Sequence, residues 1–204
     1  MNLIKSNTTG VILAGGQSRR MGFNKAEAEM HGESMLIRMI DKLKRVVPHI
    51  ILSTGAMTYP NIHFSQVADE YPGCGPLGGI YSALKFSTGT FNLVVSCDIP
   101  LVSIPLLKYI VAQAMEGSAL ITVPVDHDGQ VQTMCAVYHR DILPFVEQQI
   151  NAHKFKMKDL LELVSVEYIK IPREHSLYQE HAFMNVNTPS SLQEARMIWN
   201  SHQE

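Results

Sequence analysis

The chain has 204 residues, a formal net charge of −2, and an apolar fraction of 46%. This composition can build one folded domain and argues against disorder, while the charge argues against broad contact with nucleic acid or an anionic membrane. The sequence shows no secretion signal or membrane-spanning run, and its three isolated cysteines indicate neither a disulfide framework nor a zinc site, so we expect a single domain, residues 1–204, in the cytoplasm.

Apolar stretches that read as strands alternate with helical patterns along the chain. We expect strands at residues 10–14, 50–54, 92–97, 119–123, 133–138, 166–171 and 183–186, and helices at 34–47, 78–86, 104–115, 141–150, 156–163 and 189–199. In the first of these helices Arg38, Asp41, Lys42 and Lys44 lie off the apolar stripe. The alternation predicts an α/β fold with a mostly parallel sheet and helices on both faces. Such sheets bind ligands beyond the carboxyl ends of their strands.

A glycine-rich turn follows the first predicted strand. Gly15 and Gly16 let backbone N–H groups approach an anion, and Arg19, Arg20 and Lys25 add cations within the next ten residues. The turn matches neither the P-loop pattern nor the dinucleotide fingerprint. We therefore predict a phosphate-binding loop of another kind.

Asp98 comes directly after the apolar strand predicted at 92–97. A carboxylate at that edge of the sheet suits Mg²⁺, which prefers oxygen ligands. The alternative is that Asp98 caps the helix beginning near Ser103, although Ser103 is itself the better cap. We predict that Asp98 is a magnesium ligand.

Two other acidic segments carry weaker signals. Asp69 opens a stretch rich in glycine and proline that leads into a helix, where it is either a turn former or a ligand contact, with Glu70 as a competing carboxylate. Residues 126–129 read as a hairpin turn between two strands, and residues 128–132 are expected to border an acceptor pocket.

The stretch LAGGQSRRMGFNKA resembles the signature loop of the molybdenum cofactor guanylyltransferases. The resemblance implies a three-layer α/β/α sandwich with a Rossmann-like central sheet, of the nucleotide-diphospho-sugar transferase type. It also implies that Leu13, Ala14, Gly15 and Gly16 contact the nucleotide, while Arg20 and Lys25 hold the triphosphate and take part in catalysis.

The resemblance extends to three further motifs. VVSCDIPLV is similar to the family's metal-binding strand end, which implies that Asp98 bridges Mg²⁺ to the α-phosphate region and is catalytic. The segment beginning at Asp69 is similar to a nucleotide-binding element. The sequence FMNVNTPSSL resembles an acceptor-side element, which implies that Asn185 and Asn187 line the molybdopterin side. The nucleotide-binding half would then span about 1–105 and the acceptor-binding half about 106–204.

The chain also departs from the family pattern. After Ile150 the family often has a glycine and arginines, where this chain has Lys154, Lys156 and Lys158. Lysine lacks the bidentate geometry of arginine. Ser53 stands where the family has an asparagine after the second strand.

The reaction implied by the resemblance is transfer of GMP from GTP to the terminal phosphate of molybdenum-bearing molybdopterin. Proteins that supply or receive the molybdenum cofactor are implied partners. The alternatives are a molybdopterin cytidylyltransferase, a sugar-1-phosphate nucleotidyltransferase, and a nucleotide-binding module without turnover. The Gly15-Gly16 pair and the Asn185/Asn187 pair favour guanine over cytosine by resemblance.

Overall fold

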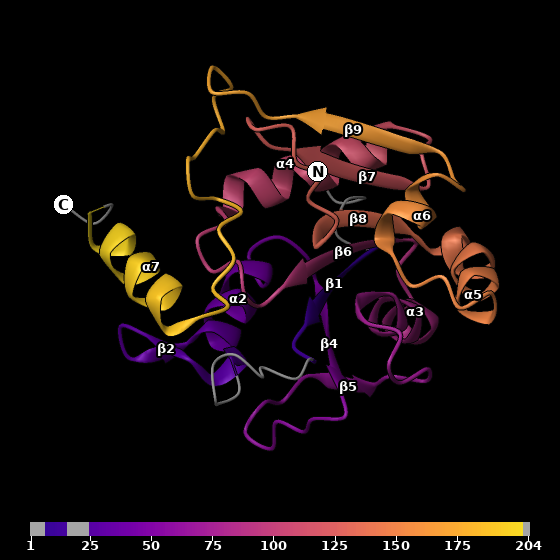
Figure 1. Cartoon of the computed structure of the whole chain (residues 1–204), viewed down its shortest axis with the longest axis horizontal. Coiled ribbons are helices and arrows are strands. Elements are labelled where there is room, and N and C mark those ends of the chain that lie inside the picture. The colour runs from indigo at the N-terminus through magenta and orange to yellow at the C-terminus, as the bar shows by residue number, and fades with distance from the viewer. Residues whose placement is uncertain (1–6, 16–24, 202–204) are drawn as a thin grey trace.

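A seven-stranded sheet forms the centre of the computed structural model, which describes residues 7–15 and 25–201 (Figure 1). Its strand order is β5-β4-β1-β6-β8-β7-β9. The strands are β1 (Thr8–Leu13), β4 (His49–Gly55), β5 (Ser65–Ala68), β6 (Phe91–Ser96), β7 (Ile121–Val125), β8 (Cys135–His139) and β9 (Val166–Lys170). All neighbouring strands are parallel except that β8 runs antiparallel to both β6 and β7. The prediction of a mostly parallel sheet is confirmed.

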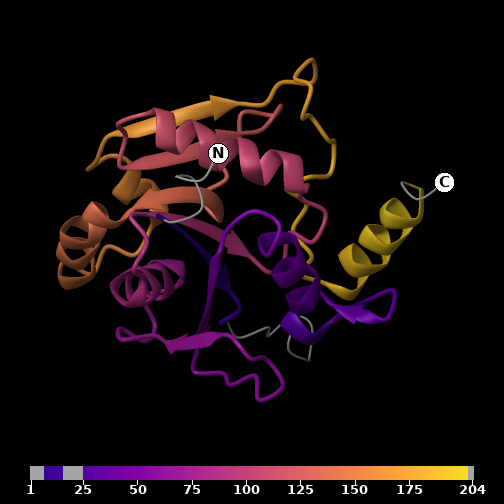
Figure 2. The ribbon, with the colours of Figure 1, turned by 180° about the vertical axis from the view of Figure 1, so that it is seen from behind.

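Helices cover both faces of this sheet, as the strand–helix alternation predicted (Figures 1 and 2). On one face α2 (Met35–Leu43) and α4 (Ile104–Glu116) pack over side chains such as Ile12. On the other face α3 (Pro76–Phe86), α5 (Leu143–Asn151) and α6 (Met157–Leu161) pack over its neighbour Val11. Because both faces are covered, every residue of β1 is buried. The fold is the predicted three-layer sandwich.

The C-terminal helix α7 (Pro189–Ser201) lies beside β2 (Glu29–Met30) and β3 (Glu33–Ser34), away from the central sheet (Figures 1 and 2). A third, smaller core joins these elements through the buried residues Ala28, Met30, Met35, Val186, Leu192 and Ala195. The Arg196 side chain donates two hydrogen bonds to the Glu29 carbonyl, at 3.1 and 2.6 Å. The end of the chain is thus fastened to the segment that follows the glycine-rich loop.

Several predicted elements differ from the structure. The strand predicted at 183–186 is wrong, because this segment is irregular and joins no sheet. The helix predicted at 34–47 ends at Leu43, and the helix predicted at 141–150 starts as a short 3₁₀ turn, η2 (Arg140–Ile142). The short strands β2, β3 and β5 were not predicted, since they carry no apolar run. All three cysteines are buried free thiols.

Within the described ranges, 7–15 and 25–201, we find no helix with the length and apolarity needed to span a bilayer.

Candidate active site

The glycine-rich turn starts against the end of β4. The backbone N–H groups of Ala14 and Gly15 both donate to the Ser53 carbonyl at 2.9 Å. A Cβ atom on Gly15 would lie 2.6 Å from the Gly55 nitrogen, so a larger residue does not fit there. The loop is therefore pinned where it leaves the sheet, and Ser53, the departure from the family pattern, supplies the backbone oxygen that pins it.

Other backbone groups at this turn are also engaged within the protein. The Leu13 carbonyl accepts a hydrogen bond from the Cys97 N–H at 3.2 Å, and the Ala14 carbonyl accepts one from the Tyr59 hydroxyl at 2.8 Å. A carbonyl oxygen has two lone pairs, so each can still accept a ligand N–H group. The contacts of Leu13, Ala14 and Gly15 to a nucleotide remain predictions, and each of the Leu13 and Ala14 carbonyls would have to use its second lone pair.

The cationic part of the predicted phosphate site lies outside the described residues. Gly16 and Arg20 belong to the segment 16–24, which the structure does not describe. Lys25 begins the 3₁₀ helix η1 (Lys25–Glu27), and its side chain is likewise outside the description. Their roles stay predictions.

Asp98 lies beside the glycine-rich turn because β1 and β6 are adjacent and parallel. Leu13 pairs with Ser96, and Asp98 follows two residues later with only 6% of its surface exposed. The alternative role as a helix cap is excluded, because Ser103 caps α4 by accepting a hydrogen bond from the Leu106 N–H. The structure thus brings a buried carboxylate to the edge where the glycine-rich loop starts.

Asp69 directly follows β5 at the same edge, close to the start of α3. A Cβ atom on Gly79 would lie 2.6 Å from Ser53 Oγ and 3.5 Å from Asp69 Oδ1, so glycine permits this close approach of α3. Asp69 Oδ1 is buried and has no hydrogen-bond partner among the residues described, and burial raises the pKa of this carboxyl group. The competing Glu70 instead forms an exposed ion pair with Lys85 at 2.7 Å.

The two aspartates follow strands that are not neighbours in the sheet. Three inter-strand spacings separate β5 from β6, which is roughly 14–15 Å at the usual distance between strands. In the described part of the chain, no group of three or more His, Cys, Asp or Glu residues could hold a metal. A single buried carboxylate such as Asp98 nevertheless fits Mg²⁺, which is commonly held by one or two carboxylates together with substrate phosphates and water.

The predicted acceptor-side segment lies directly against Asp98. The Val186 N–H donates to the Asp98 carbonyl at 2.8 Å, which fastens residues 185–187 to the strand end. Asn185 is exposed and Asn187 is half-buried, on irregular backbone rather than on one face of a strand. Thr188 caps α7, since its hydroxyl accepts a hydrogen bond from the Ser191 N–H. The juxtaposition with Asp98 was not predicted.

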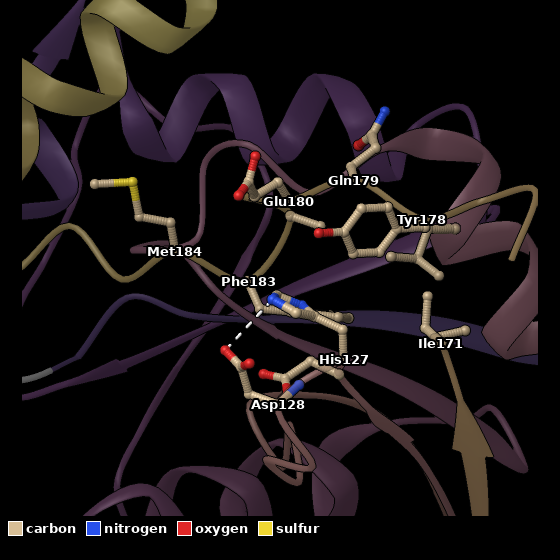
Figure 3. Close-up of a pocket in the computed structure, with 11 residues that line it drawn as sticks. His127, Asp128, Ile171, Tyr178, Gln179, Glu180, Phe183 and Met184 are labelled. Atoms are coloured by element: carbon tan, nitrogen blue, oxygen red, sulfur yellow. Dashed lines mark hydrogen bonds and ion pairs between the residues drawn. The ribbon is translucent and has the colours of Figure 1, made fainter. Parts of the chain in front are cut away.

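A cavity of about 170 Å³ opens at the carboxyl ends of β7 and β9 (Figure 3). Its walls come from the turn after β7 and from residues 178–184, and buried Leu106, Ile171 and Ala182 form its apolar part. The His127 ring meets the edge of the Tyr178 ring at a centroid distance of 5.3 Å. Among the described residues that line the cavity, none is lysine or arginine.

The turn after β7 is the predicted hairpin turn. Asp126 shapes it, because its carboxylate accepts hydrogen bonds from the Asp128 N–H, the Gln130 N–H and the Gln132 side chain. Of residues 128–132, which were expected to border an acceptor pocket, Asp128 lines this cavity, and its carboxylate lies 3.4 Å from His127 Nε2. The other lining residues were not predicted to form a pocket, and His127, Tyr178 and Glu180 are among them.

The sequence offered little to identify those three residues. The segment 172–181 is polar and irregular, and it contains no spacing typical of a site. The lysines that stand where the family often has arginines, Lys154, Lys156 and Lys158, are exposed around the start of α6 and do not line this cavity.

Known proteins similar to this chain were found by sequence and by structure. Residues 10–169 match the MobA-like NTP transferase domain family. A Pelotomaculum thermopropionicum protein named probable molybdenum cofactor guanylyltransferase is 40% identical over 193 residues, 93% of this chain and 92% of that one. A Flavobacterium johnsoniae protein with the same name is 31% identical over 184 residues, 90% of this chain and 94% of that one.

Solved structures agree on the fold. Molybdopterin-guanine dinucleotide biosynthesis protein A from Archaeoglobus fulgidus has a TM-score of 0.83 at 22% identity, covering 95% of this chain and 99% of that one. A Mycobacterium tuberculosis protein in complex with manganese has a TM-score of 0.64 at 16% identity, covering 94% and 99%. The chain is therefore a nucleotidyltransferase that belongs to the MobA-like NTP transferase family.

Proposed function

We propose that this enzyme transfers GMP from GTP to the terminal phosphate of molybdenum-bearing molybdopterin, forming the guanine dinucleotide cofactor and pyrophosphate. The names of the relatives support this reaction. The observation that carries it is the meeting of three segments at one strand end. Pairing of β1 with β6 sets the glycine-rich turn beside Asp98, and the Asp98 carbonyl in turn binds Val186 of the acceptor-side segment.

In this proposal the carboxyl edge of one domain is divided between the two substrates. The half up to about residue 105 supplies β5, β4, β1 and β6, and it binds the nucleotide through Leu13, Ala14, Gly15, Gly16 and Asp69. The half from about residue 106 binds the acceptor. The strands that lead to these two aspartates, β5 and β6, lie roughly 14–15 Å apart, which suits an extended nucleotide whose base and ribose lie near Asp69 and whose α-phosphate lies near Asp98.

In the transfer step an oxygen of the acceptor phosphate attacks the α-phosphorus of GTP. The new bond joins that oxygen to the α-phosphorus, the bond from the α-phosphorus to the bridging oxygen breaks, and pyrophosphate leaves with that oxygen. A phosphate is already nucleophilic at neutral pH, so no activated serine or cysteine is needed. Catalysis then consists mainly of positioning and charge neutralisation.

The residues of the chain divide this work between them. Lys25 and Arg20 hold the triphosphate, and Asp98 would hold Mg²⁺ at the α-phosphate. Bound there, Mg²⁺ supplies positive charge that offsets the charge developing on the phosphoryl oxygens. Burial of Asp98 keeps its carboxylate out of bulk water. Electrostatic interactions are stronger in the protein interior than in water, so a metal held there acts more strongly on the phosphate.

We further propose that the cavity beside β7 and β9 takes the pterin end of the acceptor (Figure 3). Two inter-strand spacings, roughly 9–10 Å, separate β6 from β7, which leaves room for the acceptor phosphate at Asp98 and its ring system in the cavity. The absence of described cations from the lining disfavours a phosphate there. Asp128 and Glu180 instead offer acceptors for the N–H groups of an amino-oxo-pyrimidine ring, with Asn185 and Asn187 between cavity and metal.

We also propose that the reaction takes place in the cytoplasm and that the acceptor comes from, and the product goes to, other proteins of molybdenum cofactor metabolism. Guanine is preferred to cytosine because Gly15-Gly16 and the Asn185/Asn187 pair resemble the guanylyltransferase pattern.

The direct test is pyrophosphate release by purified protein with Mg²⁺, molybdopterin and each of GTP, CTP and ATP in turn. We expect release with GTP that depends on the acceptor. Preference for CTP would assign the chain to the cytidylyltransferases, and absence of turnover with all three nucleotides would indicate a binding module.

A further inference from the structure

Two cationic side chains of α2 turn inward, although the sequence placed them off its apolar stripe. Arg38 is only 9% exposed, and its guanidinium donates to the Met30 carbonyl. The Lys42 ammonium donates to the carbonyl oxygens of Pro100 and Val102, the latter at 2.6 Å. In contrast Lys44 is exposed and pairs with Asp41 at 2.9 Å, as expected of a solvated helix face.

The setting of Lys42 is costly for a charged group. Burial lowers its pKa from 10.5 to about 8, and the neighbouring charge of Arg38 adds to that effect. Without a donor at this place, however, the carbonyls of Pro100 and Val102 would lose their charge-assisted hydrogen bonds inside the protein. The hydrogen bonds to these two carbonyls thus offset the cost of burying Lys42, and both carbonyls belong to the segment of backbone that follows Asp98.

That segment connects the carboxylate to α4 in a tight path. Asp98 ends the run from β6, the Val102 N–H donates to the Ile99 carbonyl at 3.3 Å, and Ser103 caps α4. Ile99 and Val102 are buried at 3% and 0% exposure, so the segment is packed on its apolar side as well. The Lys42 ammonium fixes it from the polar side.

Lys42 and Arg38 together connect this segment to the other two parts of the site. The Trp199 ring of α7 lies 4.6 Å from the Arg38 guanidinium carbon and 5.7 Å from Lys42 Nζ, which suits cation–π attraction. Met30 belongs to the segment after the glycine-rich loop, and α7 follows the acceptor-side residues. Two cations on one helix therefore bind the backbone of two site segments and contact a side chain of the third.

We propose that Lys42 is a positioning residue for Asp98. Its hydrogen bonds to Pro100 and Val102 hold the turn that begins at Asp98, and so set where this carboxylate lies relative to the glycine-rich loop. The inference rests on the proposed function, in which Asp98 holds the metal. An error of about 1 Å in such a placement can lower a rate about a hundredfold, so loss of these bonds affects turnover more than nucleotide binding.

The test compares Lys42→Met, which keeps most of the length of the side chain but has no donor, with Lys42→Arg, which keeps donors. A mostly apolar cavity of about 230 Å³ beside Lys42 provides space for the larger arginine. Lys44→Met on the same helix is the matched control. Each protein is assayed for pyrophosphate release, for GTP binding without metal, for the Mg²⁺ concentration giving half-maximal rate, and for amide hydrogen exchange across residues 97–103.

For Lys42→Met we expect kcat to fall about tenfold to a hundredfold, the half-maximal Mg²⁺ concentration to rise, and exchange to speed up across 97–103. GTP binding should stay within about twofold. Lys42→Arg should restore most of the turnover and of the exchange protection, and Lys44→Met should match the wild type in every assay.

The inference would be overturned if Lys42→Met had the same kcat and the same exchange rates as the wild type. It would also be overturned if exchange became faster evenly over the whole chain and turnover and GTP binding fell equally. If Lys42→Met does not fold, Lys42→Gln replaces it, and the same split between kcat and GTP binding decides. If the wild type itself releases no pyrophosphate with any nucleotide, the proposed function fails. Local exchange at 97–103 then still decides whether Lys42 orders the turn.

Discussion

The two halves of the carboxyl edge are built differently. Over β5, β4, β1 and β6 the strands are parallel, and the acidic residues that follow them, Asp69 and Asp98, are half-buried and buried. Beyond β6 the antiparallel strand β8 interrupts the parallel order, and two of the three acidic residues at the cavity, Asp128 and Glu180, have largely exposed side chains. The third, Asp126, is half-buried and accepts the hydrogen bonds that shape the turn. A buried carboxylate is costly unless protein partners or a bound ligand compensate its charge, whereas an exposed one can recognise a ligand at little cost to the fold. The first half is thus built for charge chemistry and the second for recognition.

The sharpest way to break this comparison is Asp98→Ala. Loss of a metal-holding carboxylate should remove several kcal/mol of transition-state stabilisation, so we expect turnover to fall roughly a thousandfold while GTP binding without metal changes little. Pyrophosphate release and equilibrium GTP binding measure the two effects. Asp141→Asn, an exposed aspartate after β8, serves as the control. Full activity of Asp98→Ala at saturating Mg²⁺ would remove Asp98 from the mechanism.

Lys25→Ala tests the cationic loop of the first half. The loss of one charged hydrogen-bond donor to phosphate is worth about 1.5–3 kcal/mol, so GTP affinity should fall roughly tenfold to a hundredfold. Titration calorimetry with GTP measures this change, and Lys154→Ala, exposed after α5, is the control. An unchanged affinity in Lys25→Ala would argue against a triphosphate contact at this loop.

A smaller effect is expected from the second half. In Glu180→Gln a carboxylate at the cavity is replaced by an amide of equal size, so the KM for the pterin acceptor should rise about threefold to tenfold with the KM for GTP unchanged. Glu174→Gln, exposed in the same segment but outside the cavity lining, should behave like the wild type. A selective rise in the KM for GTP would instead assign the cavity to the guanine base.

The smallest expected effect is on stability, and it comes from the burial of the Asp69 carboxyl group in the first half. Burial raises the pKa of folded Asp69 above 3.8, so from pH 3.8 up to the raised value the folded chain binds more protons than the unfolded chain. The free energy of unfolding therefore falls as pH rises through that window and stays lower above it. Asp69→Asn removes this penalty, and we expect a higher melting temperature at pH 7 together with weaker GTP binding.

Thermal unfolding of wild type and Asp69→Asn between pH 4 and 7 would check that difference. The control Glu70→Gln breaks only an exposed pair with Lys85 and should change stability little. A melting temperature at pH 7 no higher in Asp69→Asn than in wild type would show that the buried carboxyl group carries no such penalty.

Much of the first half could be predicted because its signals are local. The apolar runs that became β1, β4 and β6 are continuous, as expected for strands covered on both faces, and Gly15 and Asp98 directly follow two of them. The strand predicted at 183–186, which would have carried Asn185 on its face, is wrong. There the Val186 N–H bonds to the Asp98 carbonyl, a contact between distant parts of the chain rather than part of a strand ladder.

The sequence by itself determined the α/β class, the parallel strands and the residues at their carboxyl ends. These follow from the spacing of apolar residues and from the rule that parallel strands end at one edge. Only the tertiary structure decided that Val186 lies on Asp98, that Tyr178 and His127 enclose a cavity, and that Lys42 turns inward to the Pro100 and Val102 carbonyls. Those contacts join residues far apart in the chain, and they depend on which backbone groups the packed fold leaves in need of a partner.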